Sequence, residues 1–144
     1  DAPQTLTRLM NMGVPTFNIA SSILVITAQR LARRLCNCKQ PVTVPPETLL
    51  NAGFAESDLD GSWTLYGPGS CERCKGSGYK GRVGIYQVMP VTEAIQRIIM
   101  SGGTSLDIAA QAAEEGVKNL RQSGLLKVKQ GLTSLDEVLS TTNV

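Results

Sequence analysis

The chain has 144 residues, of which 42% are hydrophobic and 18% charged, and its formal net charge is +2. This size allows one modest hydrophobic core, or two lobes that share one. The net charge is too small to indicate a polyanionic partner, and the few scattered aromatic residues offer no platform for stacking nucleic-acid bases. The longest apolar stretch, residues 23–26, is far shorter than a membrane span.

The first 35 residues predict two helices. Apolar residues three and four positions apart indicate a short helix over residues 3–12, which Gly13 ends. A cap at Thr16 or Asn18 then predicts a longer helix that continues to Leu35. Its basic end would complement the helix dipole and lead directly into the first cysteine pair.

The middle of the chain predicts short elements and a hairpin. Residues 39–46 contain three prolines and are expected to be extended, and Pro46 begins a short helix that Gly53 ends. An acidic stretch after this helix predicts another turn or short helix. Strands are predicted over residues 63–66 and 82–89, as the two arms of a hairpin that carries the second cysteine pair.

From Thr92 onward the sequence predicts a small helical bundle. The tetrapeptide Thr-Ser-Leu-Asp occurs at residues 104–107 and again at 133–136, and a threonine followed three residues later by an acid is the pattern of a capping box. Glycines are expected to end these helices. The predicted helices cover residues 92–100, 108–115 and 119–130, with a last one after the second capping box. The fold class predicted is mainly α with a small β-hairpin.

Four cysteines occur in two tight pairs, Cys36 with Cys38 and Cys71 with Cys74, in a chain that has no histidine. A tetrahedral structural zinc site needs four such soft ligands about 2.3 Å from the metal. Glycines after Cys74 suit a turn whose backbone folds closely around sulfur. The sequence therefore predicts a Zn²⁺ site, and the single residue between Cys36 and Cys38 leaves open whether both bind.

Two other interpretations of the cysteines are open. Paired disulfides would suit a secreted protein, but the sequence shows no signal peptide, and a cytosolic interior keeps thiols reduced. Inert buried thiols are the second alternative. Redox activity is disfavoured because a reactive Cys-x-x-Cys pair usually lies at a helix start, whereas this pair is expected in a hairpin.

Basic residues surround the cysteines. Four thiolates and a divalent metal carry a formal charge of about −2, which neighbouring cations would compensate. The basic residues are Arg33, Arg34, Lys39, Arg73, Lys75, Lys80 and Arg82, with Glu72 as the nearby acid. Local positive charge therefore has a structural explanation and need not indicate nucleic acid.

No catalytic residues are predicted. The sequence contains no Gly-x-x-x-x-Gly-Lys-[Ser/Thr] phosphate loop, no histidine for acid–base catalysis and no carboxylate cluster beside a nucleophile. No nucleotide-binding residues are expected in this chain either.

Several segments resemble one family. Residues 28–36 read Ala-Gln-Arg-Leu-Ala-Arg-Arg-Leu-Cys, and residues 71–86 read Cys-x-x-Cys-x-Gly-x-Gly-Tyr-x-Gly-Arg-x-Gly-Ile-Tyr. Together with residues 5–9, 15–22 and 131–139, they resemble the C-terminal part of the secretion and pilus traffic ATPases, the family of the type IV pilus extension motor PilB and the type II secretion ATPase GspE. The resemblance covers essentially the whole chain. The family often has two residues, not one, between its first cysteine pair.

The resemblance implies a cytoplasmic, RecA-like ATPase that forms hexamers at the inner-membrane pilus machinery and uses ATP and Mg²⁺ bound upstream of this region. Residues 1–35 would then be a helical segment from the end of the RecA-like core, residues 36–90 a tetracysteine zinc subdomain, and residues 91–144 the helical bundle. This region alone is not expected to hydrolyse ATP. The resemblance also suggests the platform protein PilC and a PilZ-type regulator as partners, with no nucleic acid and no membrane insertion.

Two functions of other classes are alternatives. Cys71-x-x-Cys74 with its following glycines is similar to the cysteine repeat of DnaJ-type zinc chaperones, which normally occurs four times and here once. The basic residues would suit a zinc-ribbon nucleic-acid binder. Phe54, Trp63 and the acidic residues 56–60 are conceivable partner anchors, with ordinary core packing as the alternative.

Overall fold

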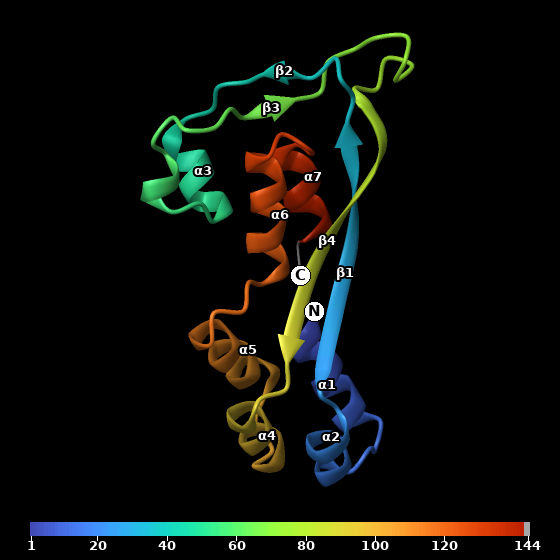
Figure 1. The fold of residues 1–144 in the computed structure, drawn as a ribbon, viewed down its shortest axis with the longest axis vertical. Helices are drawn as coiled ribbons and strands as arrows, with labels where there is room; N and C mark the ends of the chain where they lie inside the picture. Colours follow the sequence, from blue (N-terminus) through green and yellow to red (C-terminus); the bar gives the residue numbers. More distant parts are fainter. Residues whose placement is uncertain (143–144) are drawn as a thin grey trace. The chain divides into compact units, whose positions relative to one another are not determined.

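The computed structural model describes residues 1–142, which contain seven α-helices, one short 3-10 helix and four β-strands (Figure 1). The strands form two sheets of two strands each, β1 with β4 and β2 with β3. Strands β1 (Val25–Leu35) and β4 (Tyr79–Pro90) are long and run in opposite directions in Figure 1. The fold is thus mixed helical with small antiparallel sheets.

The described residues divide into two compact units, and each is built from two stretches of chain. Unit 1 contains residues 1–29 and 86–119, and unit 2 contains residues 30–85 and the chain from residue 120. Each unit includes part of β1 and part of β4.

Unit 1 is a helical unit with a core rich in isoleucine. It contains α1 (Ala2–Asn11), α2 (Thr16–Ser22), α4 (Glu93–Met100) and α5 (Ser105–Glu114). Helix α2 packs on α4, and α5 packs on both α1 and α4. The largest fully buried side chains here are Leu6, Ile19, Met89, Ile95, Ile99 and Ile108, and Pro3 is also fully buried.

Helix caps in unit 1 follow the sequence closely. Thr104 accepts a hydrogen bond from the amide of Asp107, whose carboxylate accepts one from the amide of Thr104, so the first predicted capping box is confirmed. Thr92 caps α4 as predicted. Asp1 caps α1, and the predicted helix over residues 3–12 is confirmed to within a residue.

Unit 2 contains α6 (Leu120–Lys129) and α7 (Leu135–Thr141), which pack on each other. Gly124 allows this close packing, because a Cβ at this position would lie 2.6 Å from a methyl carbon of Val138. The rest of unit 2 is α3 (Pro46–Ala52), the 3-10 helix η1 (Glu56–Asp58), β2 (Gln40–Pro41) and β3 (Tyr66–Gly67). Both predicted short elements, α3 and η1, are confirmed.

The predicted helix from residue 16 to Leu35 is wrong. Helix α2 ends at Ser22, and β1 begins at Val25. Exposed and buried residues alternate over residues 25–28, which is the period of a strand. The β-branched residues Val25, Ile26 and Thr27 favour this conformation, and hydrogen bonding to β4 stabilises it.

The predicted hairpin between residues 63–66 and 82–89 is also wrong. The first of these strands is reduced to β3, which pairs antiparallel with β2 with Gln40 opposite Gly67 and Pro41 opposite Tyr66. The second is β4, which pairs with β1. The prediction paired strands that are neighbours in sequence, whereas the strands that actually pair lie far apart in the sequence.

The C-terminal helices do not form the one bundle that was predicted. Helices α4 and α5 belong to unit 1, and α6 and α7 belong to unit 2. The second predicted capping box is shifted by one residue, since Ser134 caps α7 by accepting from the amide of Glu137. Residues 143 and 144 of the predicted bundle lie outside the described residues. The division of the chain into residues 1–35, 36–90 and 91–144, as parts with different functions, stays a prediction.

Among residues 1–142, no helix combines the length and the apolar character needed to cross a membrane.

Candidate metal centre

The first cysteine pair lies in a tight turn directly after β1. The amide of Cys36 donates to the carbonyl of Gly78 at 2.9 Å, which ties this turn to the second cysteine loop. The amide of Lys39 donates back to the carbonyl of Cys36 at 3.0 Å and closes the turn. One intervening residue is therefore enough to direct Cys36 and Cys38 toward the same place.

The second pair lies in a loop between β3 and β4 that folds around its own sulfurs. The amide of Gly76 donates to the carbonyl of Cys71, and the amide of Ser77 to the carbonyl of Cys74. Lys75, Gly76 and Gly78 have positive φ angles of 55°, 82° and 82°. Left-handed backbone of this kind favours glycine, so the glycines noted in the sequence have a defined conformational role.

Two glycines allow the cysteine loops to approach each other. A Cβ on Gly69 would overlap the carbonyl of Cys38, and a Cβ on Gly78 would overlap Pro68. The amide of Gly78 also donates to Sγ of Cys74 at 3.1 Å. The backbone thus directs a positive dipole at one sulfur, as expected where negative charge on sulfur must be stabilised.

The four sulfurs form one cluster, which we call the cysteine cluster: Cys36, Cys38, Cys71 and Cys74. Their Sγ atoms all lie within 4.8 Å of one another. The Sγ–Sγ distances are 3.7 Å for Cys36 to Cys71, 3.8 Å for Cys38 to Cys74 and 3.7 Å for Cys71 to Cys74.

These distances fit a shared metal ion better than disulfides. A tetrahedron of sulfurs with bonds of about 2.3 Å to a central ion has edges of about 3.8 Å. A disulfide needs a bond of about 2.05 Å, and all four cysteines are free. The cysteine cluster can therefore hold a metal ion, and the structure brings together all four residues that the sequence singled out.

Proton affinities differ strongly across the cluster. Burial raises the pKa of the Cys38 thiol to about 12, and the neighbouring thiols reinforce the shift. Burial acts in the same direction on Cys74, but hydrogen bonds with the backbone of Cys71 and Gly78 outweigh it and lower its pKa to about 6. The set of sulfurs thus includes one that readily becomes a thiolate, the form in which cysteine binds metals.

Side chains from distant segments hold the cluster against α6 and α7. Lys39 donates to the carbonyl of Gly131 at 2.8 Å, and its ammonium lies 4.4 Å from the centre of the Tyr66 ring. The amide of Leu35 donates to the carbonyl of Leu132. The turn between α6 and α7 is therefore fixed to the residues that flank Cys36.

A second set of contacts centres on Glu137, which sequence reasoning missed. Its carboxylate accepts hydrogen bonds from the amide, Nε and a terminal nitrogen of Arg33, at 2.8, 2.9 and 2.7 Å. The Arg33 guanidinium also lies 4.1 Å from the centre of the Tyr79 ring, and Tyr79 hydrogen bonds with Ser134. Arg33 was expected to complement a helix end; it instead lies on β1 and pairs with α7.

Among the residues considered as partner anchors, the aromatic pair is packed, whereas Glu56 and Asp60 are exposed. Phe54 is buried and stacks on Trp63, with ring centres 5.0 Å apart. Asp58 pairs with Lys129 at 2.9 Å. Core packing, the alternative for the aromatic pair, is thus what the structure shows.

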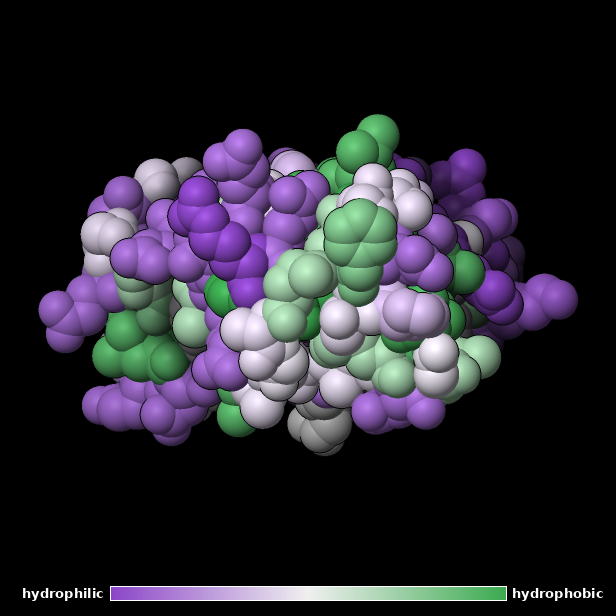
Figure 2. Space-filling model, turned by 90° about the horizontal axis from the view of Figure 1, so that it is seen from below, coloured by the Kyte–Doolittle hydropathy of each residue, from purple (hydrophilic) through white to green (hydrophobic). Residues whose placement is uncertain are grey.

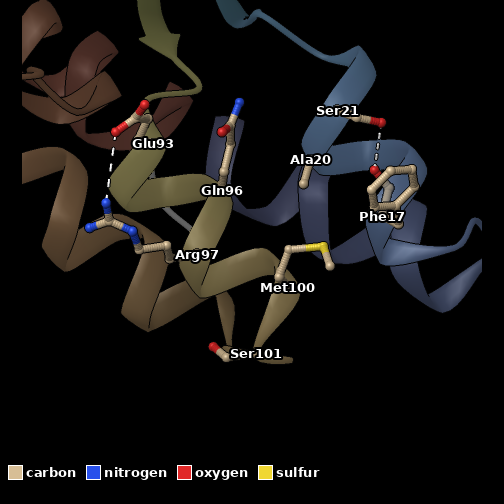
Figure 3. Close-up of a pocket in the computed structure, with 8 residues that line it drawn as sticks. All are labelled: Phe17, Ala20, Ser21, Glu93, Gln96, Arg97, Met100 and Ser101. Carbon is tan, nitrogen blue, oxygen red and sulfur yellow. Dashed lines mark hydrogen bonds and ion pairs between the residues drawn. The ribbon is translucent and has the colours of Figure 1, made fainter.

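An open groove of about 720 Å³ lies between α2 and α4 in unit 1. Figure 3 shows Met100 extending from α4 toward α2, where Phe17 lies, and the Glu93–Arg97 ion pair along α4. Phe17 is 65% exposed and Met100 49%. In the view from this end, hydrophobic residues gather near the middle of the face with hydrophilic residues on both sides (Figure 2).

Comparison with known proteins identifies the family. The chain is 58% identical to the type IV pilus assembly ATPase PilB of Pseudomonas aeruginosa, over 98% of the chain and 25% of the relative. It is 43% identical to PilB of Thermus thermophilus, over 99% of the chain and 16% of the relative. It is 38% identical to type II secretion system protein E of Dickeya dadantii, over 95% of the chain and 26% of the relative.

The chain therefore spans about a quarter or less of the length of these relatives. The model of the type II/IV secretion system protein family matches residues 1–140. With this match over nearly the whole chain, and with PilB proteins more similar to it than the type II secretion proteins, the chain belongs to the type II/IV secretion system protein family, in its PilB/GspE group.

Proposed function

We propose that this chain is the C-terminal, metal-stabilised, partner-binding region of the hexameric ATPase that powers type IV pilus assembly. The observation that carries the proposal is the 58% identity to a PilB protein over 98% of the chain. A role in type II secretion is the second candidate, supported by the 38% identity to a protein E. Membership of this family disfavours the chaperone and nucleic-acid functions.

Zn²⁺ is the metal we propose for the cysteine cluster. Cys36, Cys38, Cys71 and Cys74 would be its ligands, and four sulfurs with no open position are typical of a structural rather than a catalytic zinc. When bound, the ion would supply a fixed cross-link between the turn after β1 and the loop before β4. The hydrogen bond from Gly78 to Cys74 and the contact of Lys39 with Gly131 orient these two segments.

The proposed role assigns nucleotide binding and metal binding to different parts of the full-length protein. ATP and Mg²⁺ would bind outside this chain, in a RecA-like core whose last part is residues 1–35. Residues 36–90 would be the zinc subdomain and residues 91–144 the C-terminal helical part. We propose a cytoplasmic homohexamer at the inner-membrane pilus machinery, with the platform protein PilC and a PilZ-type regulator as partners.

Complementation tests this proposal. A pilus-forming bacterium that lacks its own PilB would receive the full-length gene that contains this chain, or the same gene with Cys74→Ser. We expect pili with the unchanged gene and few or none with the variant, at equal protein levels. If the unchanged gene restores type II secretion in a strain lacking protein E, but never pili, the second candidate replaces the first.

A further inference from the structure

A cavity of about 250 Å³ lies beside the cysteine cluster, and three cations line it. Arg34 comes from the end of β1, Arg73 from the second cysteine loop and Lys80 from the start of β4. The other lining residues are Leu35, Cys36 and Asn37. We call this the basic cavity.

The three cations differ from the other basic residues of unit 2. Arg33, Lys39 and Lys129 all have partners within the unit, in Glu137, the carbonyl of Gly131 and Asp58. Among residues 1–142, by contrast, the side chains of the three cavity cations take part in no hydrogen bond or ion pair. They contribute charge to the cavity without a counterion from the fold.

Compensation of the metal site explains these cations only in part. Within the described residues, the hydrogen bond that a sulfur accepts from outside the cluster comes from the backbone amide of Gly78. No basic side chain donates to a sulfur there. The three cations that line the cavity also outnumber the charge of about −2 on a metal bound by four thiolates. Net positive charge is therefore left at the cavity.

From these observations we propose that the basic cavity binds a phosphate group. Two guanidinium groups and one ammonium offer many donors, and Arg in particular matches the geometry of phosphate oxygens. Inorganic phosphate carries between one and two negative charges, which suits three cations better than the single charge of a carboxylate, whereas the phosphodiester of a lipid headgroup carries one charge. The volume lies below the roughly 300–1,000 Å³ typical of pockets for drug-sized ligands and is ample for one phosphate group.

The phosphate group can be free in solution, or it can be the headgroup of an anionic lipid. Both sources share the chemistry that the cavity would recognise. The proposal does not depend on the pilus function, but it does require the metal-bound cysteine loops that form two walls of the cavity. Metal content is therefore measured first in each protein tested.

The experiment follows backbone amide NMR shifts of the metal-loaded chain during titration with inorganic phosphate at low ionic strength. Chloride at the same ionic strength is the reference. We expect saturable shifts at residues 34–37, 73 and 80. Arg34→Gln and Lys80→Gln should each weaken phosphate binding by about fivefold or more, since each removes a charged hydrogen-bond donor. Arg82→Gln is the matched control, because Arg82 is an exposed cation on the same strand that does not line the cavity.

A second arm identifies the source. Binding to phosphatidylcholine vesicles is compared with binding to vesicles that also contain phosphatidylglycerol. Saturable phosphate binding without preference for the anionic vesicles supports a free phosphate ligand. Binding to the anionic vesicles that Arg34→Gln and Lys80→Gln weaken, and Arg82→Gln does not, supports a lipid headgroup.

Three results would overturn the proposal. One is the absence of saturable shifts. Another is an equal loss in Arg82→Gln, which would indicate general attraction to the basic surface. In the last, the cavity variants lose their metal to a chelator but bind phosphate as before. This would show that the three cations stabilise the metal-bound thiolates and do not bind phosphate.

Discussion

Units 1 and 2 are stabilised in different ways. Unit 1 depends on buried isoleucines and on helices capped by residues a few positions away in sequence. Unit 2 also buries apolar side chains, such as Val128 and Val138, and it adds polar contacts between distant residues, such as Arg33 with Glu137 and Lys39 with Gly131. The comparison indicates that a bound metal matters to unit 2 far more than to unit 1.

Loss of the metal should give the largest difference between the units. Cys71→Ser or Cys74→Ser should release about one zinc per chain and loosen unit 2, because both cysteine loops lose their cross-link. Helices α6 and α7 are expected to lose protection with it, while α4 and α5 keep theirs. Hydrogen exchange measured by helix, together with elemental analysis, checks this. Equal loss of protection in α4 and α6 would contradict the comparison.

A cavity in the core of unit 1 should give the next largest effect. Ile99→Ala removes a fully buried side chain and should lower the free energy of unfolding by about 2–5 kcal/mol. Its zinc content should stay unchanged, since residue 99 is outside the unit that holds the cysteines. Thermal or denaturant unfolding gives the first quantity and elemental analysis the second. Zinc loss in this variant would show that the units are not separable.

Crowding between α6 and α7 tests the packing of unit 2 without touching a polar contact. Gly124→Ala would place a methyl group against Val138 and should cost about 1–3 kcal/mol of stability, despite the better helix propensity of alanine. Ser123→Ala on the same helix is the control. A Gly124→Ala protein as stable as this control would show that α6 and α7 are not closely packed.

The smallest expected effect is the pH dependence from Glu137. Burial raises the pKa of this carboxyl, but its hydrogen bonds from Arg33 outweigh burial and place the pKa below its ordinary value of 4.5. The ion pair therefore stabilises unit 2 above pH 4.5, and this stability is lost as the pH falls through the lowered pKa. Glu137→Gln should cost about 1–2 kcal/mol at pH 7.

The difference in free energy of unfolding between the unchanged protein and Glu137→Gln should then shrink below pH 4.5. Denaturant unfolding at several pH values measures it. A constant difference at all pH values would mean that the charge on Glu137 contributes nothing.

Local features were predictable from the sequence and long-range ones were not. Caps such as Thr104 with Asp107 involve residues three positions apart, so they are visible in one short window. The cysteine cluster was also predictable, because two closely spaced pairs of cysteines are visible in the sequence and are typical of a metal site. The conformation of β1 depends on pairing with β4, about fifty residues later in the chain, and a single window around residue 30 resembles a helix.

Glu137 shows the same limit at the level of one side chain. Its position in the first turn of α7 has an ordinary explanation in the helix dipole, so nothing in the sequence marks it as the partner of Arg33. Tyr79 likewise follows a glycine-rich turn without any pattern that predicts its contact with Ser134. Such partners become visible only when residues 55 to 104 positions apart in the sequence are placed side by side.

The alternation of the two units along the chain has a consequence for synthesis on the ribosome. Residues 36–74 emerge before α6 and α7 and can take up a metal ion while those helices are still untranslated. The second stretch of unit 1, residues 86–119, is synthesised next. The second stretch of unit 2, from residue 120, is synthesised last. The ion would thus hold the two cysteine loops of unit 2 together until α6 and α7 are synthesised.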